Sequence, residues 1–276
     1  MINPNNIVIR EFEKGLKEGY NKNYGLWKPE YGDIIAWAGR EIGSLVSSKC
    51  DALYHNLEHM IEVSTTGQEI LLGQHKKERV EPEDWLNFML SCISHDIGYI
   101  KNLFDNDIND RKINSDASMT SNHVDRSKRY IIERFKGNNI INAEKIADLI
   151  EYTRFPNKPE NLKNNGKDKY GILMRAADFI GQCANIHYCD KNMVSLFYEF
   201  EEIGANQRFG YNNVQDMRTK YPDFFFKAVY PLLSEAIGCL ERTENGHQII
   251  TNLYGNVKKA ELQAQQAQKQ EYALQK

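Results

Sequence analysis

The sequence lacks the patterns that indicate strands, membrane spans or export. No run of alternating apolar and polar residues predicts a strand, and no glycine-rich phosphate-binding loop is present. No stretch approaches the roughly 20 apolar residues that span a bilayer. The first residues, MINPNNIVIREFEKG, show no basic segment followed by an apolar one, so we expect no secretory signal. These absences predict an all-α protein of the cytoplasm that does not enter a membrane.

Cysteine and net charge are both low, and each excludes a class of protein. The five cysteines are an odd number and are widely spaced, which favours buried, reduced thiols over a disulfide framework. The formal net charge of −3 provides no electrostatic basis for binding a nucleic-acid polymer. We therefore expect a small-molecule ligand.

Helical periodicity fills most of the chain. We predict helices over 31–52, 55–73, 81–96, 122–136, 143–153, 169–188, 192–203, 211–220 and 223–241, the last with a kink at Pro231. The segment 81–96 has apolar residues around its circumference and should be a central buried helix. Two long polar connections, 98–122 and 156–168, separate these helices. The first has the length of a lid or binding loop.

The chain divides into a principal domain and two flanking segments. We expect an N-terminal segment over 1–30, a domain with helical additions over 31–240, and a C-terminal helical tail over 241–276. The last part of the tail, VKKAELQAQQAQKQEYALQK over 257–276, is rich in Gln, with little hydrophobic face. It should extend into solvent, fray or contact a partner chain, which makes a homo-oligomer through the C-terminal helices one expectation.

Three stretches contain histidine and aspartate in helical contexts. In YHNLEHMIEV, His55 and His59 are four residues apart, so that both imidazoles can face one site on a helix. A surface pair is the plain alternative. In SCISHDIGYI, His95 and Asp96 lie at the carboxyl end of an apolar helix, and in LMRAADFIGQ, Asp178 lies in an apolar stripe. Burial and the helix dipole disfavour such carboxylates unless a cation accompanies them.

These side chains form a candidate set of metal ligands from three helices. His59, His95, Asp96 and Asp178 supply two imidazoles and two carboxylates. Such ligands suit Mn²⁺, Fe²⁺, Co²⁺, Ni²⁺ or Zn²⁺, with Mg²⁺ at a carboxylate-rich second position. Four protein ligands on an octahedral ion leave two positions for water or substrate, as metal-assisted hydrolysis requires.

The same stretches resemble a known family. YHNLEH, SHDIG and AADF, in this order, are similar to the H…HD…D signature of the HD superfamily of metal-dependent phosphohydrolases. YHNLEHMIEV also resembles the Tyr-His-Asn-x-x-His-x-x-(Asp/Glu)-Val pattern of class I cyclic nucleotide phosphodiesterases. The resemblance covers residues from about 50 to 182. It implies an HD-domain helical bundle, here with additional C-terminal helices.

The resemblance also implies a role for each residue. His59, His95, Asp96 and Asp178 would hold a divalent metal, with Asp96 as the catalytic carboxylate that bridges two ions. His55 would protonate the leaving oxygen, and an imidazole that titrates near neutrality is suited to this task. Glu62, one turn beyond His59, is a candidate for orienting one of the rings.

Three further residues are candidates for contact with the substrate. His123 is expected at a helix start, where family members often carry a histidine near the second metal or the substrate phosphate. Arg126 is three residues further on and is either a phosphate contact or a solvated charge. Gln182 lies four residues after Asp178, on the same helical stripe.

Two departures from the family pattern restrict the expectation. Phosphodiesterases carry a further histidine where this chain has Tyr99, which weakens the assignment to cyclic nucleotides. Di-iron members carry two histidines between the HD pair and the last aspartate, and here the interval contains only His123. We therefore expect one firm metal site and a second that binds weakly.

Three functions stay open at this point. The first is a metal-dependent hydrolase that cleaves a phosphate ester, such as a nucleotide, a cyclic nucleotide or a related small phosphate, with metal-activated water and His55 as general acid. The second is an HD-type di-iron oxygenase, which the missing histidine disfavours. The third is a catalytically weak helical module that binds a metal or a nucleotide.

Overall fold

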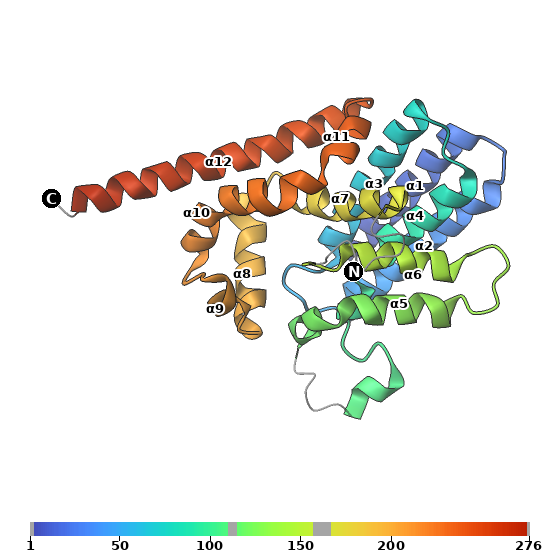
Figure 1. Ribbon diagram of the computed structural model, residues 1–276. Coiled ribbons are helices and arrows are strands. Elements are labelled where there is room, and N and C mark those ends of the chain that lie inside the picture. Colours follow the sequence, from blue (N-terminus) through green and yellow to red (C-terminus); the bar gives the residue numbers. More distant parts are fainter. Residues whose placement is uncertain (1–2, 110–114, 157–166, 275–276) are drawn as a thin grey trace.

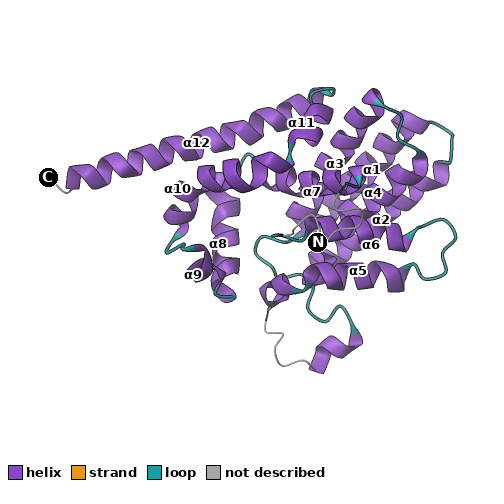
Figure 2. Cartoon of the chain, in the orientation of Figure 1, coloured by secondary structure: helices purple, strands orange, loops and turns teal. Residues whose placement is uncertain are grey.

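The computed structural model describes residues 3–109, 115–156 and 167–274, and within these ranges the chain forms helices joined by turns, with no strand (Figure 2). The predicted all-α fold is confirmed. Among the described helices, none combines the length and the apolar character that crossing a bilayer demands. Figure 1 shows a bundle of helices from which the last, long helix projects.

The centre of the bundle is formed by α3 (Leu57–Lys77), α4 (Pro82–Ser94) and α7 (Lys169–Cys183). As predicted for 81–96, α4 is buried on almost every side, and its large side chains Trp85, Phe88 and Met89 have no exposed surface. Removing such side chains from water stabilises the fold by about 1.5–3 kcal/mol each. This rigid centre carries the residues of the candidate site.

Four helices surround this centre. α1 (Pro4–Tyr24) and α2 (Pro29–Lys49) pack against each other, and α2 packs on α4. α5 (His123–Arg134) packs on α6 (Ala143–Ile150), which also lies against α4 and α7. The predicted cap of α6 is present, because the Asn142 side chain accepts a hydrogen bond from the Lys145 backbone N–H at 2.9 Å.

Two glycines allow the segments of the site to approach closely. A Cβ atom on Gly181 of α7 would lie 2.9 Å from Cα of Val63 on α3, so only glycine fits this contact without a shift. A Cβ atom on Gly98 would lie 2.0 Å from the His123 carbonyl oxygen at the start of α5. The first contact brings Asp178 toward α3, and the second brings the segment after α4 against α5.

Some predicted boundaries are wrong at the site itself. The helix predicted over 55–73 begins only after Asn56, whose side chain accepts hydrogen bonds from the Glu58 and His59 backbone N–H groups. His55 therefore lies in the turn before α3 and not on the helix. The connection 98–122, predicted as a loop, contains the short 3₁₀ helices η1 (Ile97–Tyr99), η2 (Asp105–Asn109) and η3 (Asp116–Ser121). Most of the predicted connection 156–168 lies outside the described residues.

The C-terminal helices are more interrupted than predicted. α7 ends at Cys183, and a π-helical turn, Tyr188–Asn192, leads into α8 (Met193–Glu202). A short α9 (Ala205–Phe209), which we did not predict, lies between Gly204 and Gly210, both at positive φ. The chain continues through α10 (Val214–Phe224), a π turn (Phe225–Val229), a 3₁₀ turn (Tyr230–Leu232) and α11 (Ser234–Leu240). The single helix predicted over 223–241 is wrong, because Pro231 has no N–H to continue a helix.

The C-terminal helix α12 (Glu244–Leu274) begins as part of the packed body. It contacts α10, α3 and α7, and its residues Leu253, Val257 and Ala260 are buried. Farther along, it extends beyond the other helices (Figure 1). Val257 and Ala260 belong to the stretch 257–276, for which we predicted little hydrophobic face, so the start of that stretch packs against the body of the protein.

Candidate metal centre

Three helices bring two histidines and two aspartates to one point. His59 lies in the first turn of α3, His95 and Asp96 follow α4 directly, and Asp178 lies within α7. The Nε2 atoms of His59 and His95 are 3.4 Å apart, and they lie 3.3 and 3.2 Å from Oδ2 of Asp96. Oδ1 of Asp178 lies 3.4 and 3.7 Å from the same two nitrogens. Ligand atoms bound at about 2.0–2.2 Å to one ion have similar mutual separations, so this geometry fits a metal.

The two imidazoles are buried, and the two carboxylates are more open. His59 and His95 are 2% and 1% exposed. The side chain of Asp96 is 11% exposed and that of Asp178 is 21% exposed. An ion held by this group would therefore be shielded on the histidine side and reached by water or substrate from the side of Asp178.

Hydrogen bonds to the second ring nitrogens orient both imidazoles. His95 Nδ1 donates to the Cys92 carbonyl at 2.9 Å, which leaves the Nε2 lone pair for the centre. The Tyr54 hydroxyl lies 3.1 Å from His59 Nδ1 and fixes that ring in the same way. Such partners set the tautomer and the direction of a metal-binding histidine.

The imidazoles and carboxylates of the group stabilise one another's charged forms. Burial alone would lower the pKa of His59, but the carboxylates of Asp178 and Asp96 outweigh it and raise that pKa to about 10. The pKa of His95 is raised as well, with burial opposed mainly by Asp96. Burial would raise the pKa of Asp96, yet the two rings hold it well below its ordinary value. Protons on the imidazoles thus balance the carboxylates, and a divalent ion would replace them.

His55 forms a second, separate arrangement beside the centre. Its Nδ1 hydrogen-bonds to Oε1 of Glu199 on α8, a carboxylate that is only 1% exposed. Glu199 also accepts the backbone N–H of Tyr54 at 2.9 Å and that of His55 at 3.4 Å. Burial would raise the pKa of Glu199, but the His55 ring and these N–H groups lower it below its usual range. Glu199 therefore stays charged and holds His55 in place.

Sequence analysis did not identify Glu199. The residue lies in MVSLFYEFEE, beyond the stretch that resembles the HD superfamily. The available signal was a glutamate on the apolar side of an otherwise hydrophobic helix, where an unpaired carboxylate is costly.

His123 lies beside Asp96, one of the candidate ligands. Its Nδ1 donates to the Thr120 carbonyl at 2.8 Å, and its Nε2 lies 3.6 Å from Oδ1 of Asp96. Burial lowers the pKa of His123, so the ring is neutral near pH 7 and presents a free lone pair. The Tyr99 ring stacks on both histidines, with centroids 4.2 Å from His55 and 4.4 Å from His123.

Arg126 does not have the surroundings of a phosphate-binding residue. Its guanidinium is buried and donates to both carboxylate oxygens of Asp107 at 2.8 Å. It also donates to the Gly98 and Ile100 carbonyls at 2.7 Å. The predicted substrate contact is therefore corrected to a structural role, because Arg126 holds the segment after α4 against α5.

Gln182 and Glu62 also have other partners than predicted. The Gln182 amide donates to the Tyr188 hydroxyl at 3.1 Å. Glu62 accepts a hydrogen bond from the Asn185 amide and bonds to no histidine ring, so the orienting role expected of it belongs to Tyr54 and Glu199. Burial raises the pKa of Glu62 to about 7.

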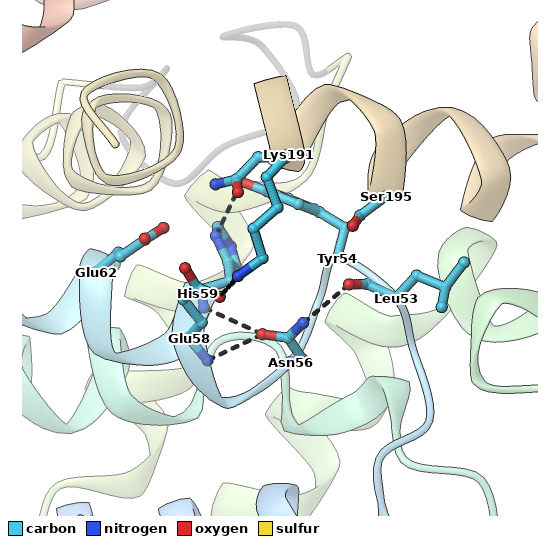
Figure 3. Close-up of a pocket in the computed structure, with 9 residues that line it drawn as sticks. Leu53, Tyr54, Asn56, Glu58, His59, Glu62, Lys191 and Ser195 are labelled. Atoms are coloured by element: carbon cyan, nitrogen blue, oxygen red, sulfur yellow. Dashed lines mark hydrogen bonds and ion pairs between the residues drawn. The ribbon is translucent and has the colours of Figure 1, made fainter. Parts of the chain in front are cut away.

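A small polar pocket adjoins the outer side of His59 (Figure 3). It is lined by Tyr54, Asn56, Glu58, Glu62 and Lys191, among others, and Lys191 forms an ion pair with Glu58. This pocket lies between the start of α3 and the segment that leads into α8. It belongs to the surroundings of the candidate centre.

Two aspartates attach the connection 98–122 to the turn that carries His55. The buried carboxylate of Asp116 accepts the Asp51 backbone N–H at 2.5 Å and that of Lys101 at 2.7 Å. In return, Asp51 accepts the Asp116 backbone N–H at 3.1 Å and forms an ion pair with Lys101. The segment before His55 and the segments around Tyr99 and His123 are thus joined.

Fold and site together define an all-helical protein in which histidine and aspartate side chains could hold a metal ion. The chain belongs to the Npun_R2479-like family, whose model matches residues 2–263. No match to the chain was found among curated proteins. The matched range includes α1, every residue of the candidate centre, and Glu199, so all of these are parts of one family unit.

Proposed function

We propose that the protein is a metal-dependent hydrolase of the HD type that cleaves a phosphate ester. The supporting observation is that Nε2 of His59 and Nε2 of His95 lie 3.4 Å apart and that each lies 3.2–3.7 Å from a carboxylate oxygen of Asp96 and of Asp178. Two imidazoles and two carboxylates are suited to Mn²⁺, Fe²⁺, Co²⁺, Ni²⁺ or Zn²⁺. The substrate is a nucleotide, a cyclic nucleotide or a related small phosphate.

The chain's own residues supply the acid–base chemistry. His59, His95, Asp96 and Asp178 would hold a divalent ion, which would supply Lewis-acid activation of a water nucleophile. Glu199 holds Nδ1 of His55, which leaves Nε2 to deliver a proton to the departing oxygen. The Tyr99 hydroxyl, 3.4 Å from His55 Nε2, fixes the ring in this orientation.

The position of His123 supports a second, weaker metal site. Its Nε2 lies 3.6 Å from Oδ1 of Asp96, whereas His59 and His95 lie close to the other oxygen of the same carboxylate, Oδ2. One imidazole and one shared carboxylate are few ligands for an ion, so water would complete its coordination. We expect one firm site and a second site that fills only at high metal concentration.

The test combines metal analysis with a substrate panel. Purified protein, the variant Asp96→Ala and the control variant Asp33→Ala, which changes an exposed aspartate on α2, are analysed for bound metal. Each is then offered phosphate monoesters, diesters and nucleotides, and phosphate release and O₂ consumption are recorded. We expect the unmodified protein and Asp33→Ala to contain bound metal and to release phosphate from a substrate. Asp96→Ala should contain no metal and release no phosphate. Full metal content in Asp96→Ala, or O₂ consumption without phosphate release, would refute the proposal.

A further inference from the structure

Arg175 on α7 carries a charge that the described residues do not neutralise. Its Nε donates to the Tyr152 carbonyl at 2.8 Å, and its Cζ lies 5.5 Å from the centroid of the Tyr152 ring. Its Nη2 is buried and has no hydrogen-bond partner. Burial lowers the pKa of Arg175, and no carboxylate opposes this effect. Arg175 is half-buried, and a guanidinium that is partly withdrawn from water without an anion is costly, so Arg175 is suited to an anionic ligand.

Helical spacing places Arg175 on the same side of α7 as Asp178. Arg175 is three residues before Asp178 and four before Phe179, and side chains at these separations are neighbours on a helix. The Asp178 side chain is the more exposed of the two carboxylates of the centre. Arg175 and the more exposed carboxylate of the centre therefore lie on neighbouring turns of the same side of α7.

An exposed aromatic ring lies on the same side of α7. Phe155 is 49% exposed, although its ring packs edge-on against Phe179 at 5.4 Å and against Phe224 at 6.1 Å. The short segment from Tyr152 to Phe155 thus contacts both Arg175 and Phe179. On the side of α7 that carries Asp178, the protein has one cation without an anionic partner among the described residues and one partly exposed ring.

The segment that holds Arg175 is itself fixed to α7. A Cβ atom on Gly171 would lie 2.4 Å from the Tyr152 ring, so only glycine allows this close contact. The Asp168 backbone N–H lies 3.3 Å from the Tyr152 hydroxyl, to which it donates. The carbonyl that orients Arg175 is therefore held before any ligand arrives, which reduces the entropic cost of binding.

We propose that Arg175, Phe155 and Phe179 bind the organic part of the substrate, and that the substrate is a phosphate ester whose organic part has a planar ring and a second anionic group. The ring packs on Phe155, and the second anion pairs with Arg175. This inference rests on the proposed function, because the metal centre positions the phosphate that is cleaved. It also explains why Arg126, already paired with Asp107, is not needed for this purpose.

The experiment measures binding without turnover. Protein loaded with Mn²⁺ is titrated calorimetrically with methylphosphonate, phenylphosphonate and carboxyphenylphosphonate, which cannot be hydrolysed. We expect affinity to rise in that order, with about tenfold or more for the added carboxylate, the gain typical of a hydrogen bond between charged groups. Arg175→Gln should abolish the gain in affinity from phenylphosphonate to carboxyphenylphosphonate, and Arg175→Lys should keep part of that gain. Phe155→Ala should reduce the gain in affinity from methylphosphonate to phenylphosphonate.

The control variant Arg40→Gln removes an exposed arginine of α2 and should leave the whole series unchanged. Thermal unfolding of each variant shows whether it is folded. Equal affinity for phenyl- and carboxyphenylphosphonate in the unmodified protein would overturn the inference, and so would an equal loss for both ligands in folded Arg175→Gln. If the series separates as expected while no phosphate ester is hydrolysed, the binding site stands and the proposed reaction falls.

Discussion

His55 and His59 are close in sequence but have different partners, and substitutions should separate their roles. His55 pairs with Glu199 outside the cluster of ligand atoms, whereas His59 lies within it. We expect His55→Gln to keep its metal and to lose about 10²–10⁴-fold in turnover, the usual contribution of a general acid. His59→Ala should lose the metal. Metal analysis and steady-state kinetics measure the two effects.

A substrate with a good leaving group sharpens this comparison. A nitrophenyl ester needs no proton on the departing oxygen, so His55→Gln should lose less activity toward it than toward an alkyl ester. His59→Ala should show no such recovery. If His55→Gln lost its metal while His59→Ala stayed active, the two roles would be reversed.

The pKa of His59 predicts that metal binding depends on pH. Because this pKa is raised to about 10, the ring carries a proton near pH 7 in the metal-free protein, and the ion must displace it. The apparent affinity should therefore rise by up to about tenfold per pH unit and per proton released, as long as the pH stays below the pKa. Calorimetry with Mn²⁺ in two buffers of different ionisation enthalpy counts the protons. An affinity that is constant between about pH 6 and 8 would contradict the assignment.

Single residues of the site differ in how well sequence predicts them. His59, His95, Asp96 and Asp178 were selected because charged or titratable groups in apolar helices need partners, and the structure brings them together. That they bind a metal stays a prediction. The hydrogen bonds from Tyr54 to His59 and from His55 to Glu199 were not predicted, and the second joins residues 144 positions apart, which leave no local pattern.

At the scale of helices, the contact between η1 and α5 depends on Gly98, so that even substitution by alanine should destabilise the protein. Gly98→Ala would place Cβ 2.0 Å from the His123 carbonyl oxygen, which forces η1 away from α5. We expect a loss of about 1–3 kcal/mol in the free energy of unfolding and weaker metal binding, since Asp96 and His123 move apart. Urea unfolding and metal titration measure these effects.

Gly15 on α1 provides the matched control for this substitution. A Cβ atom there meets nothing within 4 Å, and alanine is the better helix former by about 0.5–1 kcal/mol. Gly15→Ala should therefore stabilise the protein slightly and leave metal binding unchanged. A destabilisation of the same size in both variants would show that the close contact at Gly98 is not the cause.

Helices with strong local signals were predicted well, and those shaped by distant contacts were not. α4 and α6 have clear apolar patterns and, for α6, the capping residue Asn142. The start of α3 was misplaced by two residues because Asn56, which caps it, also lies inside the histidine motif. The region around Pro231 looked continuous because its apolar residues follow helical spacing through two non-α turns.

At the scale of the molecule, one ion would connect parts of the chain that are far apart in sequence. The ligands lie 36 residues apart from His59 to His95 and 82 apart from Asp96 to Asp178. An ion bound only by the folded state stabilises it by about 2.7 kcal/mol at 100 times its Kd. We expect a chelator to lower the melting temperature by about 5–10 °C, as measured by calorimetry. Asp178→Ala should melt at the same temperature with and without chelator.

The mutual capping of Asp51 and Asp116 has a consequence for deuterium exchange. Backbone N–H groups in irregular segments usually exchange quickly, but those of Asp51, Lys101 and Asp116 are each bound by a carboxylate of this pair. We expect these amides to be protected and to exchange at one common rate, which mass spectrometry of the peptides that contain them would measure. Asp116→Ala removes the acceptor of the Asp51 and Lys101 amides, and the amide at position 116 should be released with them because the turn that carries Asp51 is then no longer attached. The turn before α3 and the connection after η1 would then open and close as a single unit, so access to His55 would be set by a local unfolding equilibrium.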